Sequence, residues 1–167
     1  MNGSLVIMGV AGCGKSSLGA AVARAHGMVL LEGDDRHSEQ SRDKMRRGIP
    51  LTDADRAGWL DELAAELQAH PLDRVLTCSA LRRVYRERLR RALPQLRFVY
   101  LDISREAAQA RVAARAEHFF AASLVDSQFA TLEPPLGERG VLRLDATAAL
   151  PQLLAEVSAW MLAKEPS

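Results

Sequence analysis

Several features of secreted, membrane-spanning and nucleic-acid-binding proteins are missing from this sequence. Its 167 residues include only two cysteines, Cys13 and Cys78, without CxxC spacing, so neither a disulfide framework nor a zinc site is expected. No apolar run approaches the roughly 20 residues that span a bilayer, and the first residues lack the charged segment of a secretory signal. The net charge of +1 predicts no basic surface for nucleic acid. These absences predict a cytoplasmic protein with neither a membrane nor a nucleic acid as partner.

The composition is instead that of an ordinary globular protein. Hydrophobic residues make up 48% of the chain, which is enough to form a buried core. No repeat, low-complexity tract or linker interrupts the sequence. We therefore expect residues 1–167 to form a single domain.

Short apolar segments alternate with longer helical segments along the chain. Strands are predicted at residues 5–8, 28–31, 75–78, 98–101 and 141–144. Helices are predicted at residues 16–25, about 53–68 with Thr52 or Asp53 as cap, after Ser79, after Ser104, and over residues 150–161. This alternation predicts an α/β fold in which helices cover both faces of a parallel sheet. Ligands of such a sheet bind at the carboxyl ends of its strands.

Residues 9–16 follow the first predicted strand and match the phosphate-binding pattern G-x-x-x-x-G-K-[ST] at every fixed position. The glycines let backbone N–H groups turn toward phosphate oxygens, and the helix that follows adds partial positive charge. In this pattern Lys15 reaches the β- and γ-phosphates, and the Ser16 hydroxyl ligates Mg²⁺. We therefore predict a nucleoside triphosphate site formed by Gly9, Val10, Ala11, Gly12, Cys13, Gly14, Lys15, Ser16 and Ser17.

A kinase also needs a group that orients the attacking hydroxyl and cations that neutralise the transferred phosphoryl group. Asp34 follows the second predicted strand and can accept a substrate proton; the alternative is a solvated acidic turn. Arg111 and Arg115 lie one helical turn apart, ahead of a polar and aromatic segment suited to a closing lid. Arg111 could stack on adenine or clamp a phosphate, and both arginines could equally be solvated residues of an amphipathic helix.

Other charged residues near strand ends have two interpretations. Arg82 and Arg86 lie in the first turns of the helix predicted after Ser79, where they could hold an anionic substrate. Asp102 ends the strand at 98–101 like a metal-binding aspartate, but a turn or capping role is the preferred interpretation.

The sequence also resembles the gluconate kinases, small P-loop enzymes within the shikimate-kinase and nucleoside-monophosphate-kinase group. The resemblance covers nearly the whole chain in order. Its specific segments are G-x-P-L-x-D-x-D-R-x-x-W-L at residues 48–60 and C-S-A-L-R at residues 78–82. Further matching segments lie at residues 8–16, 33–37, 44–45, 85–86, 114–115, 118–120, 124, 127–129 and 132–133.

This resemblance implies ATP-dependent phosphorylation of D-gluconate at its 6-hydroxyl, giving 6-phospho-D-gluconate. It also implies the strand order 2-3-1-4-5, a lid over about residues 115–127 and a homodimer. By position, Lys15 and Ser16 serve ATP and Mg²⁺, with Ser16 as the metal ligand, and Asp34 orients the sugar hydroxyl. Lys15 and Asp34 are therefore expected to be catalytic; of the two arginines on the predicted lid helix, Arg115 is assigned as catalytic and Arg111 as a nucleotide contact. The implied gluconate pocket is formed by Asp34, His37, Lys44, Arg82, Arg86 and His118.

Departures from the family pattern occur at Glu32, where relatives often have Asp, and at Cys13 and Glu117. The departure at Glu32 argues against a direct metal contact there. A sibling kinase acting on shikimate or a nucleotide, and a nucleotide-binding sensor without turnover, are the competing functions. A redox bridge between Cys13 and Cys78 is conceivable if the first and third strands pair, but two unrelated buried thiols are favoured.

Overall fold

The structure is a computed structural model that describes residues 3–114 and 122–163, apart from the side chains of residues 122 and 123. Its elements are β1 (Leu5–Met8), α1 (Lys15–His26), β2 (Val29–Glu32), the 3-10 helix η1 (Gly33–Arg36), α2 (Glu39–Arg46), α3 (Asp53–Ala69), β3 (Arg74–Thr77), α4 (Arg83–Ala92), β4 (Arg97–Asp102), α5 (Arg105–Ala113), α6 (Ala122–Thr131), β5 (Val141–Asp145) and α7 (Leu150–Leu162). The strands form one parallel sheet in the order β2-β3-β1-β4-β5. The predicted fold class and strand order are confirmed.

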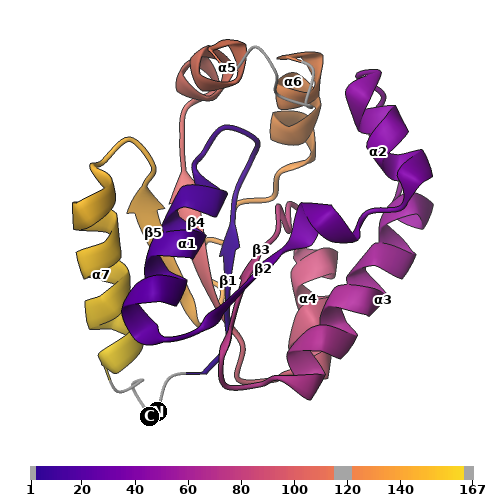
Figure 1. The fold of residues 1–167 in the computed structure, drawn as a ribbon. Helices are drawn as coiled ribbons and strands as arrows, with labels where there is room; N and C mark the ends of the chain where they lie inside the picture. Colours follow the sequence, from indigo (N-terminus) through magenta and orange to yellow (C-terminus); the bar gives the residue numbers. More distant parts are fainter. Residues whose placement is uncertain (1–2, 115–121, 164–167) are drawn as a thin grey trace.

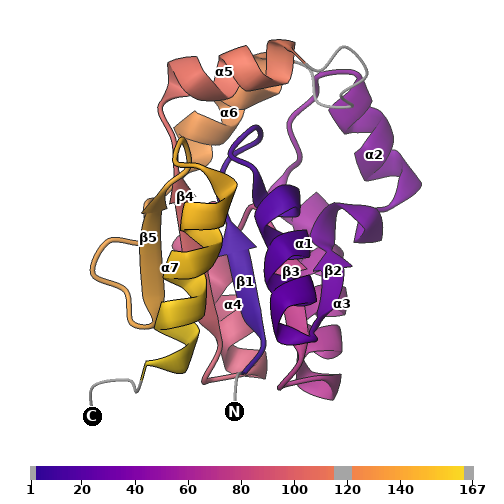
Figure 2. The same ribbon diagram turned by 60° about the vertical axis from the view of Figure 1, so that its left-hand side comes forward.

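Different helices cover the two faces of the sheet. Leu5 and Ile7 of β1 are fully buried in a cluster with residues of α1 and α7, whereas Val6 and Met8 are buried in a second cluster with residues of α3 and α4. This division follows from the strand geometry, because successive side chains point to opposite faces. Figures 1 and 2 show the two helix layers on opposite sides of the sheet. A strand buried on both faces reads as a continuous apolar run, which is why β1 was recognisable in the sequence.

Local side-chain caps fix where two helices begin. The Thr52 hydroxyl accepts a hydrogen bond from the Asp55 N–H, and the Asp55 carboxylate accepts one from the Thr52 N–H, so a capping box starts α3. Ser104 caps α5 by accepting from the Ala107 N–H at 3.1 Å. Thr52 is thus the cap of α3 rather than Asp53, and the predicted cap at Ser104 is confirmed.

The start of α4 differs from the sequence prediction. Ser79 does not cap this helix, which begins at Arg83 with Arg82 in an extended conformation as its N-cap residue. Ala80 has a φ of 46°, in the left-handed region, and this interrupts any helix that would start at Ser79. Residues 79–82 therefore form a turn between β3 and α4, which leaves their backbone and side chains at the carboxyl edge of the sheet.

That carboxyl edge is surrounded by three helices. The phosphate-binding loop, residues 9–16, connects β1 to α1 there, with α5 and α6 above it and α2 to one side (Figure 1). No helix among the described residues is both long and apolar enough to cross a bilayer. The arrangement concentrates the loops at the edge where the sequence predicts ligand binding.

Candidate active site

The phosphate-binding loop has the tight backbone that its glycines predict. Gly12 has a φ of 84°, and a Cβ atom there would lie 2.9 Å from the Ala108 carbonyl oxygen of α5. No other residue type fits so close to a neighbouring backbone in this conformation. The loop leads directly into α1, whose first-turn N–H groups and positive end make this an anion-binding site.

Lys15 is positioned by the loop itself. Its ammonium group donates hydrogen bonds to the carbonyl oxygens of Gly9, at 3.0 Å, and Val10, at 3.2 Å. No carboxylate lies within ion-pair distance of Lys15 in the part of the chain that the structure describes. The charge of Lys15 is therefore held beside the loop without an acidic partner to neutralise it.

Ser16 is joined to a carboxylate at the end of the neighbouring strand β2. Its hydroxyl donates to Glu32 at 3.1 Å, and the Thr77 hydroxyl of β3 donates to the same carboxylate oxygen. Hydroxyl and carboxylate oxygens are the ligands that Mg²⁺ prefers, usually with water and substrate phosphates completing its shell. Among the described residues, no group of three or more acidic, histidine or cysteine side chains could hold a metal.

A pocket next to this loop contains Asp34 and His37. The His37 Nε2 lies 3.6 Å from the Asp34 carboxylate, and the imidazole stacks on Trp59 with ring centroids 4.1 Å apart. Trp59 is anchored in turn by its indole N–H, which donates to the Gly33 carbonyl oxygen at 2.7 Å. The Nδ1 atom of His37 is buried and has no hydrogen-bond partner within the described protein.

Gly33 is required where β2 enters this pocket. A Cβ atom at this position would lie 2.3 Å from the Thr77 carbonyl oxygen. Only glycine allows η1 to pack so closely on β3, and η1 carries Asp34. The Gly-Asp order in the sequence thus places the carboxylate at the carboxyl edge of the sheet.

The remaining pocket wall includes residues to which the sequence analysis assigned no role. Arg56 and Tyr85 belong to the segments that carry the family resemblance, and that was their only signal. Gln128 of α6 also lines the pocket, and its side-chain oxygen accepts a hydrogen bond from the Ala11 N–H at 2.6 Å, joining α6 to the phosphate-binding loop. The full lining is Asp34, His37, Met45, Ile49, Pro50, Leu51, Arg56, Trp59, Ser79, Ala80, Leu81, Tyr85, Leu124, Ser127 and Gln128.

Two of the predicted substrate cations are paired with acids beside the pocket and are not part of its wall. Lys44 forms a 2.8 Å ion pair with Asp55, and its hydrogen bond is the main reason that the pKa of Asp55 falls to about 2. Arg82 pairs with Asp53 at 3.0 Å. Neither cation lines the pocket, so a substrate would have to compete with an existing ion pair to reach it.

Arg86 is a correction to the sequence analysis. Its side chain is completely buried, and its guanidinium donates to both oxygens of Glu138, at 3.0 and 2.6 Å. Further hydrogen bonds run to the carbonyl oxygens of Ala80 and Glu133. With every nitrogen engaged inside the protein, Arg86 is a structural residue that holds the 79–82 turn and does not contact the substrate pocket.

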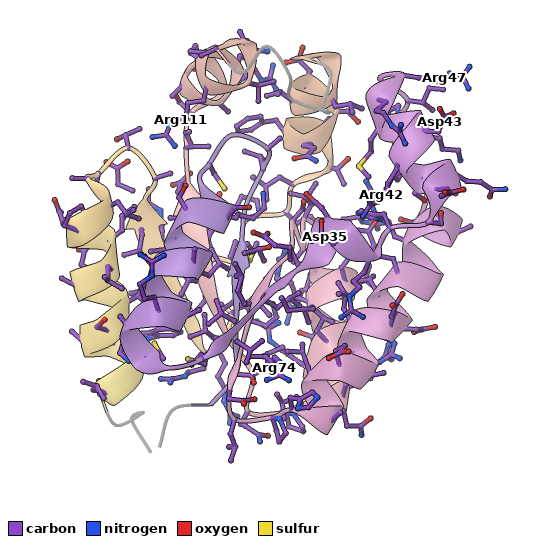
Figure 3. The ribbon with its side chains drawn as sticks, in the orientation of Figure 1. Asp35, Arg42, Asp43, Arg47, Arg74 and Arg111 are labelled. Atoms are coloured by element: carbon purple, nitrogen blue, oxygen red, sulfur yellow. The ribbon has the colours of Figure 1, made fainter. Side chains whose placement is uncertain are left out.

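Arg111 lies on the other side of the phosphate-binding loop. Its guanidinium donates to the carbonyl oxygens of Gly12, at 3.2 Å, and Ala146, at 3.0 Å, bridging the loop to the segment after β5. Figure 3 shows Arg111 between α5 and the loop that precedes α1. It borders a second pocket, formed with Cys13, Gly14, Ser17, Ala114, Ala146, Ala148, Leu150 and Leu153. A cationic plane beside small apolar side chains is suited to an aromatic base.

The remaining predictions for this edge have different outcomes. Arg115, His118 and Glu117 lie outside the described residues, and of the predicted lid only residues 122–127, the start of α6, are described. Asp102 forms an ion pair with Arg143 of β5, in agreement with a role other than metal binding. Both cysteines are free and buried.

The Cys78 thiol, which follows β3, is buried, and three charged side chains influence its pKa. Burial raises its pKa to about 12; the charge of Asp34 adds to this effect, while those of Lys15 and Arg56 oppose it. The charges of these three side chains, which belong to three different segments, all act on the same buried thiol. Such a high pKa also leaves almost no thiolate at neutral pH, which argues against a redox function for Cys78.

The sheet order, the phosphate-binding loop and an adjoining pocket with a carboxylate define a P-loop kinase, a class that uses ATP. A family model described as an AAA domain matches residues 5–135. A gluconokinase of Gluconobacter oxydans is 44% identical over 144 residues, covering 84% of this chain and 80% of that protein. The thermosensitive gluconokinase of Escherichia coli is 38% identical, covering 85% of this chain and 78% of its own length.

A solved structure is also similar to this chain and is likewise a gluconokinase. A gluconokinase from Sinorhizobium meliloti superimposes with a TM-score of 0.88 at 41% identity, covering 96% of this chain and 91% of that one. The chain belongs to the gluconokinase family, and it is an enzyme, a phosphotransferase.

Proposed function

We propose that this enzyme transfers the γ-phosphoryl group of ATP to the 6-hydroxyl of D-gluconate, giving 6-phospho-D-gluconate and ADP. The observation that carries the proposal is that the pocket lined by Asp34 adjoins the phosphate-binding loop that holds Lys15, since Gln128 of the pocket wall accepts a hydrogen bond from the Ala11 N–H at 2.6 Å. This arrangement supports a role for Asp34 in accepting the hydroxyl proton and a role for Lys15 in binding the phosphoryl oxygens. The activity of the gluconokinase relatives supplies the identity of the acceptor.

The nucleotide occupies both sides of the phosphate-binding loop in this proposal. Its phosphates lie against the N–H groups of residues 9–16, and its base lies in the second pocket beside Arg111 and Ala146. Ser16 would hold Mg²⁺, with the Glu32 carboxylate close by to orient the ion's water ligands. When bound, the ion neutralises charge on the β- and γ-phosphates.

Asp34 positions the sugar hydroxyl and accepts its proton as the oxygen attacks the γ-phosphorus and the bond to the β–γ bridging oxygen breaks. Lys15 follows the transferred group and stabilises charge that develops on its oxygens. His37, which lines the pocket beside Asp34, contacts a hydroxyl of the sugar chain in this proposal. Contacts from Lys44, Arg82 and His118, and assembly as a homodimer, remain predictions from the family resemblance. The catalytic role of Arg115 and the cytoplasmic location remain predictions from the sequence.

The deciding experiment measures ADP release with Mg-ATP and D-gluconate, beside gluconate-free, shikimate and nucleoside-monophosphate controls. Strong release with gluconate alone supports the proposal. Release with shikimate or a monophosphate instead would assign the enzyme to a sibling substrate. Tight ATP binding with no acceptor-dependent release would favour a sensor.

A further inference from the structure

We propose that Arg56 binds the carboxylate of the substrate and makes the pocket selective for a sugar acid over a neutral sugar derivative. The inference deepens the proposed function and rests on it for the identity of the acid. It replaces Arg82 and Arg86, the arginines that the sequence favours for this contact, by one that forms no ion pair with a carboxylate of the described residues.

Arg56 combines a place in the pocket wall with a charge that no carboxylate of the described residues pairs at ion-pair distance. It lies near the start of α3, is half-buried, and lines the same pocket as Asp34 and His37. Within residues 3–114 and 122–163 no carboxylate lies within ion-pair distance of its guanidinium, and its one side-chain hydrogen bond goes to the Tyr85 hydroxyl at 3.1 Å. The neighbouring cations Arg82 and Lys44 are each paired with an acid, Asp53 and Asp55.

Tyr85 fixes the orientation of this guanidinium. The Tyr85 hydroxyl donates its proton to the Asp53 carboxylate and accepts a hydrogen bond from Arg56, whose central carbon lies 5.4 Å from the centre of the tyrosine ring. The hydrogen bond from Tyr85 lowers the pKa of Asp53, while burial raises the pKa of Tyr85. Asp53 therefore stays charged and Tyr85 protonated at neutral pH, which keeps the direction of both hydrogen bonds fixed.

A fixed arginine with unused donors is matched to a carboxylate. A guanidinium carries five N–H donors, and the Tyr85 hydroxyl uses one of them here. The remaining donors can form paired hydrogen bonds to both oxygens of a carboxylate, which is the strongest geometry available to an arginine. Because little rotational freedom remains to be lost, more of that interaction contributes to binding.

The charges of the pocket also set the direction in which the substrate lies. Asp34 repels a carboxylate, whereas Arg56 attracts one, so an acid with a terminal hydroxyl binds with its acid end at Arg56 and its hydroxyl end toward Asp34. This orientation presents the hydroxyl to Lys15 and the phosphate-binding loop. A neutral analogue gains nothing at Arg56 and leaves the guanidinium unpaired.

The test compares D-gluconate with its neutral counterpart D-gluconamide in the wild type, Arg56→Gln and Tyr85→Phe. For Arg56→Gln we expect the KM for gluconate to rise about 100-fold with kcat within about threefold, because a ground-state contact is lost. The inhibition constant of gluconamide should change less than threefold. Tyr85→Phe should raise the gluconate KM about tenfold and leave gluconamide unaffected, since it acts through Arg56. Arg88→Gln, which removes an exposed partner of Asp61 between the same two helices, should change neither constant.

The same measurements distinguish a wrong role for Arg56 from a wrong substrate for the enzyme. Equal changes for gluconate and gluconamide in Arg56→Gln, or an unchanged gluconate KM, would overturn the role of Arg56 whatever the wild type phosphorylates. If the wild type instead phosphorylates another carboxylic acid and Arg56→Gln loses that acid selectively, the assignment of Arg56 holds and the proposed substrate is wrong. Thermal unfolding of each variant excludes misfolding as the cause.

Discussion

Replacing Glu138 by Gln should destabilise this enzyme more than any exposed ion-pair change. The Glu138 side chain is 6% exposed and pairs with Arg86, which is fully buried, and with Arg90. Glutamine keeps the shape but removes the charge, so Arg86 is left as a buried cation without its anion. Breaking a buried pair from one side costs about 3–5 kcal/mol. We expect the lower end, about 3 kcal/mol, because the Gln oxygen still accepts one hydrogen bond and Arg90 retains Glu87.

The measurement is urea-induced unfolding at pH 7, with Asp61→Asn as the matched control. Asp61 pairs with Arg88 on the surface, where both side chains are exposed by a third or more, and such pairs contribute about 0–1 kcal/mol. A loss of about 3 kcal/mol in a chain of this length also lowers the melting temperature by roughly 6–12 °C. A Glu138→Gln variant no less stable than Asp61→Asn would refute the assignment of a structural role to the Arg86 pair.

The pH dependence gives a second check on the same pair. Burial tends to raise the pKa of Glu138, but the hydrogen bonds from Arg86 and Arg90 outweigh it, and the pKa is lowered in the folded protein. A lowered folded-state pKa contributes stability above the unfolded value, and this contribution is lost as the pH falls through the folded one. The stability difference between wild type and Glu138→Gln should therefore be largest above about pH 5 and shrink at lower pH. A difference that stays constant down to pH 3 would contradict the charge-based explanation.

Further outcomes are expected at the site. Lys15→Ala should reduce kcat by more than about a hundredfold in the gluconate assay, because it removes a charge that stabilises the transferred phosphoryl group. Asp34→Asn should reduce kcat by more than about tenfold, which corresponds to roughly 1.4 kcal/mol of activation barrier. A smaller effect of Asp34→Asn would show that Asp34 does not have its assigned role. Gly33→Ala should lower the free energy of unfolding by at least about 1–3 kcal/mol, because the new Cβ atom would lie 2.3 Å from the Thr77 carbonyl oxygen. The control Gly58→Ala has open space around its Cβ within α3, so it should raise the free energy of unfolding by up to about 1 kcal/mol. Cys78 should resist thiol reagents in the native enzyme at pH 8 and react after unfolding, as its pKa of about 12 requires.

Much of the fold was predictable because local signals agreed with it. The strand at Leu5–Met8 was predicted at the residues where it occurs, and α5 begins at the predicted Ser104 cap. The start of α4 was wrong because the left-handed conformation of Ala80 is imposed by its surroundings, among them the Arg86 hydrogen bond, and alanine gives no local sign of it.

The residue types by themselves determined the phosphate-binding loop, since its glycines, Lys15 and Ser16 have fixed spacing and act through the backbone next to them. They could not determine which arginine faces the substrate. Arg56, Arg82 and Arg86 are chemically identical in the sequence, and each obtained its role from the acid that folding brought, or did not bring, within reach. Charge pairing between residues distant in sequence is a property of the tertiary structure. It pairs the buried Arg86 with Glu138 and, among the described residues, leaves Arg56 in the pocket wall without a carboxylate at ion-pair distance.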